Sequence, residues 1–152
     1  MCKTVGGGSK YVGIDFCLSA LRSDNRSRSA KGYRDFSSIA VDLLTDNVTS
    51  TAVQIDHLLQ KGIDAATSGC LRLCQELYIE IVGRLSGCAD GVKDGSFELV
   101  QVNLWLLASD LKKCEAGFIA SHVASPLKVD DNNAFKLAKL ADGLLDHATL
   151  SS

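Results

Sequence analysis

Apolar residues recur three and four positions apart in four long stretches of the chain, which is the spacing of one face of an α-helix. The stretches run from Tyr33 to Lys61, from Asp64 to about Val92, from Phe97 to Phe118 and from Asp130 to Ala148. Only short polar segments connect them, so consecutive helices are expected to lie side by side and antiparallel. The pattern predicts an all-α fold, a four-helix up-and-down bundle.

The pattern also predicts three details of these helices. The second helix is expected to be continuous through Cys88, because that residue shares the apolar face of the helix. Asp130, Asp131 and Asn132 are expected to cap the start of the last helix. Trp105 lies near the edge of the third apolar stripe, and its ring is expected at the boundary of the core.

Residues 1–32 differ from the rest of the chain, because no long apolar stripe runs through them. Gly6-Gly7-Gly8-Ser9 predicts a turn, and the segment from Ile14 to Leu21 predicts a short helix. We expect an N-terminal helical hairpin extension over 1–32 and the four-helix bundle over 33–152, together forming one domain. A length of 152 residues suits a single domain with its own core.

Composition and charge narrow the class of protein. Hydrophobic residues make up 46% of the chain, and a single Pro with few aromatic residues suits helices better than strands. The formal net charge is -2 and no run of Lys and Arg exceeds two residues, which argues against a nucleic-acid partner. Charged residues interrupt every apolar run before it reaches the roughly 20 residues that span a bilayer, so no membrane association is expected.

Six cysteines are many for a cytosolic chain of this length. Cys74 and Cys114 lie on the apolar faces of the second and third helices, where a bridge between neighbouring helices is geometrically reasonable. Cys2 and Cys17 flank the glycine-rich turn, and a bridge between them would close the extension into a hairpin. We therefore expect two disulfides in addition to an apolar core.

Two further cysteines, Cys70 and Cys88, lie 18 residues apart on one predicted helix. That is about 27 Å along the helix axis, so they cannot pair while the helix is continuous. Both are expected to be free thiols, and either is a candidate for linking two copies of the chain into a dimer. A metal site using Cys70 and Cys74 is the alternative, but no CxxC motif or nearby His completes it, and no metal is expected.

Two sequons, Asn25-Arg26-Ser27 and Asn47-Val48-Thr49, make Asn25 and Asn47 candidate glycosylation sites. With the cysteine content they indicate a secreted protein. The chain opens with Met1-Cys2, without the charged and apolar segments of a signal peptide, so any secretory signal is expected to have been removed.

Several segments, taken together, resemble one family of plant proteins. The segment from Asp15 to Asp24 resembles the family's opening. Cys74-Gln75-Glu76-Leu77-Tyr78 resembles its Cys-x-x-x-Tyr, and Lys113-Cys114-Glu115-Ala116-Gly117-Phe118 resembles its Thr-Cys-Glu-Asp-Gly-Phe. Ser125-Pro126-Leu127 then precedes the last helix. On these residues, nearly the whole chain is similar to the plant invertase and pectin methylesterase inhibitor family, and to a subgroup of invertase-inhibitor-like proteins that includes pollen allergens.

The resemblance implies a four-helix bundle with an N-terminal helical hairpin, bridged as Cys2–Cys17 and Cys74–Cys114. It implies a non-enzymatic inhibitor that docks non-covalently on pectin methylesterase or acid invertase as a 1:1 complex, with no catalytic residue and no cofactor. The expected location is the apoplast or cell wall, with the vacuole as an alternative.

The turn before the third core helix bears on which of the two enzymes is the target. One type of invertase inhibitor carries Pro-Lys-Phe there, and the matching residues here are Gly95, Ser96 and Phe97, the candidate target-contact turn. The Lys that would engage the carboxylates of a glycosidase is absent, so pectin methylesterase is slightly favoured and acid invertase is the alternative. The 14 residues between Cys2 and Cys17 point the other way, because pectin methylesterase inhibitors usually have a shorter spacer there.

Other interpretations of single residues and of the whole chain stay open. Phe97 is by default a core residue at a helix start. Asp24, Asp42, Asp46 and Asp56 usually mark solvated faces, but the last three also form a candidate acidic contact face for the basic rim of an enzyme cleft. A carrier of a small apolar ligand is a more distant alternative, and it would need a cavity of about 300 Å³ between the helices. A hydrolase is not expected, because no nucleophile, base and oxyanion donors form a set.

Overall fold

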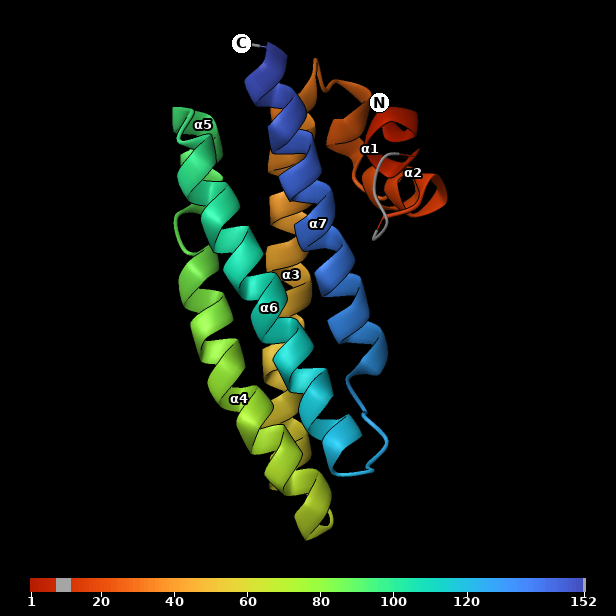
Figure 1. The fold of residues 1–152 in the computed structure, drawn as a ribbon, viewed down its shortest axis with the longest axis vertical. Coiled ribbons are helices and arrows are strands. Elements are labelled where there is room, and N and C mark those ends of the chain that lie inside the picture. The colour runs from red at the N-terminus through yellow and green to blue at the C-terminus, as the bar shows by residue number, and fades with distance from the viewer. Residues whose placement is uncertain (8–11, 152) are drawn as a thin grey trace.

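The computed structural model describes residues 1–7 and 12–151, and all regular structure in these ranges is helical (Figure 1). The predicted all-α fold is therefore confirmed. The helices are α1 (Cys2–Gly7), α2 (Ile14–Arg22), the 3-10 helix η1 (Asn25–Arg28), α3 (Tyr33–Gln60), α4 (Ala65–Leu85), α5 (Cys88–Asp94), α6 (Phe97–Ala120) and α7 (Lys128–Ser151). Among them, none combines the length and the apolarity that a membrane crossing needs.

The four long helices α3, α4, α6 and α7 lie side by side along the long axis of the molecule (Figure 1). Each packs against two others, in the cyclic order α3, α4, α6, α7 and back to α3. Their apolar faces meet along the axis of the bundle, as the helical spacing predicted. The largest fully buried side chains are Tyr78, Phe118, Leu44, Ile55, Leu71, Ile81, Leu104, Leu107, Leu111, Leu127, Leu140 and Leu144.

The N-terminal helices α1 and α2 pack against each other and lie beside one end of the bundle, next to α7 and α3 (Figure 1). The Cys2–Cys17 disulfide joins them, with the two Cα atoms 5.6 Å apart. Of the turn expected at Gly6-Gly7-Gly8-Ser9, the first two residues belong to α1, and Gly8 and Ser9 lie outside the described residues. Gly6 is needed where it is, because a Cβ there would lie 2.8 Å from the backbone of Ile14.

The expectation of one continuous second helix is wrong. The helix α4 ends at Leu85 and a separate helix, α5, begins at Cys88. Gly87 between them has a φ of 87°, a left-handed conformation that glycine adopts without steric cost. Since this conformation ends a helix, Gly87 was the signal for the break, although Cys88 still points into the core and preserves the apolar pattern.

The expected cap of the last helix is also wrong. The helix α7 begins at Lys128, so Asp130, Asp131 and Asn132 lie within its first turns. Asp131 is 1% exposed and points into the bundle. Trp105 likewise differs from expectation, because its side chain is 62% exposed on α6 and not held at the core boundary.

Candidate functional site

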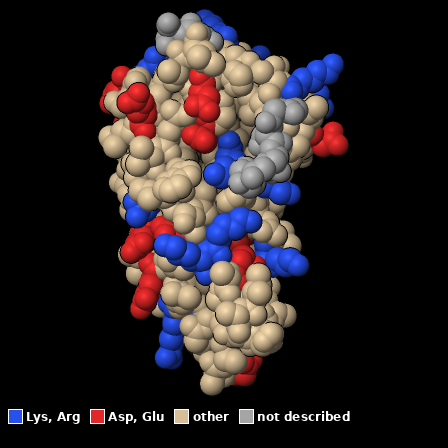
Figure 2. Space-filling model, viewed as in Figure 1, with Lys and Arg blue, Asp and Glu red and all other residues tan. Residues whose placement is uncertain are grey.

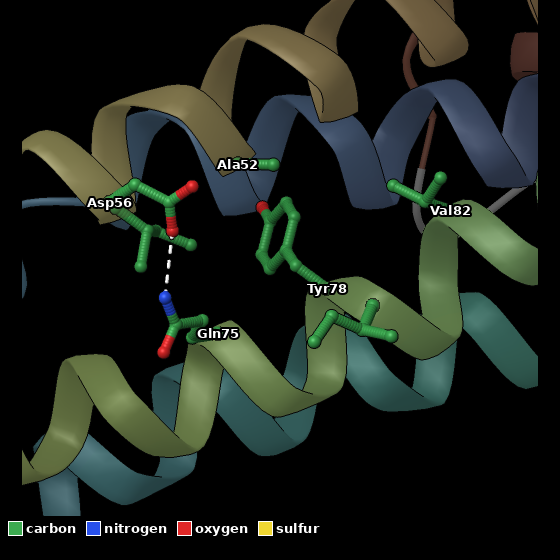
Figure 3. Close-up of a pocket in the computed structure, with 7 residues that line it drawn as sticks. Ala52, Asp56, Gln75, Tyr78 and Val82 are labelled. Carbon is green, nitrogen blue, oxygen red and sulfur yellow. Dashed lines mark hydrogen bonds between the residues drawn. The ribbon is translucent and has the colours of Figure 1, made fainter.

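A shallow groove runs between α3 and α4 on the outside of the bundle (Figure 3). It has a volume of about 340 Å³ and is lined by Ala52, Ile55, Asp56, Gln75, Tyr78, Ile79 and Val82. Tyr78 points from α4 across the groove toward Ala52 on α3 (Figure 3). At one end, the side-chain amide of Gln75 donates a hydrogen bond of 2.7 Å to Asp56 and ties the two helices together.

Exposed apolar side chains stand along this groove. Ile79 is 70% exposed and Val82 is 45% exposed on α4, and Val53 on α3 is 65% exposed. Apolar side chains that protrude in this way gain free energy when a partner covers them. The groove with Val53, called here the α3–α4 face, is therefore a candidate docking surface. Sequence analysis overlooked Ile79 and Val82, although both are apolar residues outside the core stripe of the second helix.

Part of the candidate acidic contact face is engaged within the protein. Asp42 accepts a hydrogen bond of 2.8 Å from Arg26, which also contacts Asp24. These contacts from Arg26 lower the pKa of Asp24 to about 2. Asp46 is exposed on the same helix, and Asp56 lies at the end of the α3–α4 groove. The acidic contact face is thus partly neutralised at Asp42, and of its other two carboxylates Asp56 borders the apolar groove.

Arg34 on α3 contacts the backbone just before the candidate contact turn and holds it in place. The guanidinium of Arg34 donates hydrogen bonds to the carbonyls of Val92 and Lys93, and its Cζ lies 5.7 Å from the centre of the Phe97 ring. Phe97 is half-buried and packs against the core, in keeping with its interpretation as a core residue. Gly95, with a φ of 81°, makes the turn. Because Arg34 is directed to backbone carbonyls, the turn does not present that cation outward.

The residues that carry the family resemblance meet around a disulfide inside the bundle. Cys74 on α4 and Cys114 on α6 are joined, with their Cα atoms 4.9 Å apart. The Tyr78 hydroxyl, one helical turn from Cys74, donates a hydrogen bond to Asp131 on α7. The second carboxyl oxygen of Asp131, Oδ2, lies 3.0 Å from the Cys114 sulfur. Sequence reasoning missed this role of Asp131, because its only visible signal was an acidic residue near a helix start.

A chain of hydrogen bonds continues from Asp131 to the loop between α6 and α7. Asp131 hydrogen-bonds Glu115, which accepts a 2.7 Å bond from the Ser125 hydroxyl. The Leu127 amide in turn donates to the Ser125 oxygen at 3.1 Å. Burial, with the neighbouring Glu115 carboxylate, raises the pKa of Asp131 to about 9. Asp131 therefore keeps its proton at neutral pH and in acid, which lets two carboxyl groups share one site.

This cluster does not form a metal site in the oxidised protein. Ligand atoms of Cys114, Glu115 and Asp131 lie within 4.8 Å of one another. The Cys114 sulfur is already bound in the disulfide, however, and Asp131 holds its proton. The group thus offers one carboxylate and no thiolate, which is too few ligands for zinc.

The cysteines outside the two disulfides, Cys70 and Cys88, are buried free thiols. The Cys70 sulfur donates to the Gly117 carbonyl, and the Cys88 sulfur donates to the Arg84 carbonyl at 3.2 Å. Burial raises the pKa of Cys88 to about 11. A dimer linked through Cys70 or Cys88 is at odds with this geometry, because neither sulfur reaches the surface without opening of the bundle.

The sequence is similar to that of known plant proteins over most of its length. Residues 1–143 match the family described as plant invertase/pectin methylesterase inhibitor. A protein of Platanus orientalis named "Putative invertase inhibitor" is 24% identical over 141 residues, which cover 92% of this chain and 82% of that protein. A protein of the same name from Platanus acerifolia is 23% identical over 141 residues, covering 92% of this chain and 78% of that one.

Solved structures resemble the fold over nearly the whole chain. A mutant form of a pectin methylesterase inhibitor from Arabidopsis superposes with a TM-score of 0.81 at 15% identity, covering 95% of each chain. A second structure, a pectin methylesterase inhibitor from Arabidopsis thaliana, gives a TM-score of 0.71 at 15% identity over 90% of this chain and 89% of that one. At this identity, the likeness concerns the fold.

Proposed function

This chain belongs to the plant invertase/pectin methylesterase inhibitor family, and from that premise we propose that it inhibits a plant pectin methylesterase by laying its α3–α4 face on the enzyme. The family's proteins are inhibitors and not enzymes. The observation that carries the docking face is the apolar groove, bordered by Asp56 and by the protruding Ile79 and Val82.

Two features of the α3–α4 face support docking. Its apolar side chains stand on rigid helices, so little conformational entropy is lost when a partner covers them. Asp56 lies at one end of the groove and Asp46 is exposed on the same helix, α3, so these carboxylates can meet a basic rim on the enzyme and orient the complex. We expect one inhibitor to cover one enzyme. The carrier alternative has less support, because Tyr78, Phe118 and large aliphatic side chains fill the interior of the bundle.

The candidate contact turn, Gly95 to Phe97, favours pectin methylesterase over invertase as the target enzyme. Gly95 and Ser96 supply no cation for a glycosidase site, and Arg34 beneath them is bound to backbone carbonyls. Acid invertase remains the second candidate, because the two Platanus relatives are named for invertase inhibition. The two enzymes therefore have to be tested side by side.

We propose that the protein is secreted and inhibits its target in the cell wall. Two disulfides are stable in an oxidising compartment, which supports secretion. Of the two sequons, Asn25 is exposed in η1, whereas the side-chain oxygen of Asn47 is buried within α3. We therefore place any glycan at Asn25.

The test is a titration of the oxidised protein against one plant pectin methylesterase and one acid invertase, near pH 5 and near pH 7. We expect pectin methylesterase activity to fall in proportion to added inhibitor and to reach its minimum at one inhibitor per enzyme. A stoichiometric loss of invertase activity alone would instead establish the second candidate. If neither activity falls while both disulfides are intact, the proposed function is wrong for these enzymes.

A separate prediction concerns the α3–α4 face. Replacing Ile79 by Asp is expected to weaken inhibition by about tenfold or more, because a central apolar contact becomes a charge that loses water on binding. Inhibition constants for the wild type and the variant measure the effect.

Val129→Asp is the matched control, because Val129 is also 70% exposed and lies at the start of α7, away from the groove. The control is expected to inhibit like the wild type. Equal weakening by both substitutions, or by neither, would move the contact away from the α3–α4 face.

A further inference from the structure

Lysine and aromatic side chains alternate on a different surface, formed by α6 and α7 with α2 beside them. The Lys112 ammonium lies 4.2 Å from the centre of the Phe135 ring, and the Lys139 ammonium lies 5.5 Å from the same centre. The Lys136 ammonium lies 5.4 Å from the ring of Phe16 on α2. These distances are those of cation–π contacts. These five residues and Trp105 are together called here the lysine–aromatic face.

Trp105 extends the face along α6. It precedes Lys112 by seven residues, which is two helical turns, so both lie on the same side of α6 about 10 Å apart. Its ring is 62% exposed. A surface pocket of about 380 Å³ lies beside Lys112 and Phe135, and Lys128 and Ile119 also line it. Lys and Arg side chains gather across the middle of this side of the molecule (Figure 2).

The positive charge of this face is only partly offset by nearby carboxyl groups. Glu115 lines the same pocket but accepts the hydrogen bond from Ser125. Asp131 is buried and keeps its proton. Asp142 on α7 lies close enough to Lys139 to offset part of its charge, and both Asp142 and Asp146 accept hydrogen bonds from Gln101. A chain whose formal net charge is -2 therefore concentrates cations on one face, which attracts anionic ligands locally.

Two chemical requirements follow for a ligand of this face. Lys ammonium groups are point charges that pair with carboxylates. The exposed Trp105 ring beside them offers an apolar platform, on which the C–H face of a sugar ring can stack. A sugar that carries a carboxylate satisfies both requirements at once, and a polymer of such sugars repeats them along the length of the face.

We propose that the lysine–aromatic face binds an acidic polysaccharide, a polymer of uronic acid sugars with free carboxylates. The lysines pair with carboxylates of the polymer while Trp105 stacks on a sugar ring, and Phe135 and Phe16 hold the lysines in place. A pectin methylesterase removes methyl esters and so produces such carboxylates. The choice of a uronic acid polymer therefore rests on the proposed function, although the binding itself goes beyond inhibition. The face would hold the inhibitor on the de-esterified wall polymer.

The test is equilibrium binding of the oxidised full chain to polygalacturonic acid at pH 5, compared with highly methyl-esterified pectin and with dextran. We expect binding to polygalacturonic acid, weakening as NaCl is raised because exposed charge pairs are screened. The triple variant Lys112→Gln, Lys136→Gln and Lys139→Gln is expected to bind about tenfold more weakly, the size expected when three exposed ion pairs are lost. Trp105→Ala is expected to weaken binding about threefold, through lost stacking.

The matched control is the triple variant Lys31→Gln, Lys61→Gln and Lys93→Gln, which removes the same charge at exposed positions outside the face. It is expected to bind like the wild type. Equal weakening in both triple variants would show an effect of net charge alone and overturn the proposal, as would equal binding of highly esterified pectin.

Inhibition of pectin methylesterase, measured with the same variants, separates this proposal from the proposed function. Unchanged inhibition together with lost polysaccharide binding supports a second site. Lost inhibition with unchanged polysaccharide binding overturns the proposal and assigns the lysine–aromatic face to the enzyme instead. Failure of the wild type to inhibit either enzyme would leave the polysaccharide result valid by itself, because the polymer is assayed without enzyme.

Discussion

Removal of the Cys74–Cys114 disulfide by the double substitution Cys74→Ala and Cys114→Ala is expected to lower the free energy of unfolding by about 4 kcal/mol. The bridge closes a loop with a sequence separation of 40 residues and joins α4 to α6 in the middle of the core. Without it, the unfolded chain gains conformational freedom that folding must then overcome. Denaturant unfolding at pH 5, followed by circular dichroism, measures the change.

The Cys2–Cys17 bridge provides the comparison. The double substitution Cys2→Ala and Cys17→Ala opens a shorter loop, with a separation of 15 residues, in helices that lie beside the bundle. It is expected to loosen α1 and α2 with a smaller effect on unfolding of the bundle. If it lowered the unfolding midpoint as much as loss of the inner bridge, the bundle would depend on the N-terminal hairpin more than its packing indicates.

Stability is expected to fall as the pH rises from 5 to 8, by about 2 to 4 kcal/mol. Asp131 has a pKa of about 9 in the folded protein, raised from 3.8 by burial and by Glu115. The folded state therefore holds a proton that the unfolded state has released over this range. Since the folded pKa is the higher one, the stabilisation is complete below about pH 4 and is lost as the pH approaches 9. Asp142, whose pKa burial also raises, adds in the same direction.

Asp131→Asn isolates this contribution. An Asn side chain can still accept from the Tyr78 hydroxyl and donate to Glu115, but it does not titrate. The variant is expected to lose most of the dependence on pH between 5 and 8, while Asp46→Asn on the exposed side of α3 keeps it. A wild-type slope in Asp131→Asn would mean that another group binds the proton. The measurement is the free energy of unfolding at several pH values.

Much of the fold follows from local information in the sequence. The spacing of apolar residues predicted α3, α6 and the bundle. Each helix has to bury one face, and this requires apolar residues every three or four positions along the sequence. The break before Cys88 could have been anticipated from Gly87, a residue that favours the end of a helix. Cys74 and Cys114 are placed by the same helical faces, whereas the pairing of Cys2 with Cys17 followed from the glycine-rich turn between them, and the resemblance implied both bridges.

The tertiary structure alone decided which polar and aromatic residues act together. Asp131 looks like a helix cap in the sequence, but the meeting of α4, α6 and α7 places it against Tyr78, Glu115 and the inner disulfide. Burial then changes its protonation, which no local pattern encodes. Trp105 and Phe135 lie 30 residues apart, and only the packing of α6 on α7 brings their lysine neighbours onto one surface. The order of residues along the chain thus sets which side of each helix is apolar, whereas contacts between distant segments set the chemistry of the surfaces and of the buried carboxyl group.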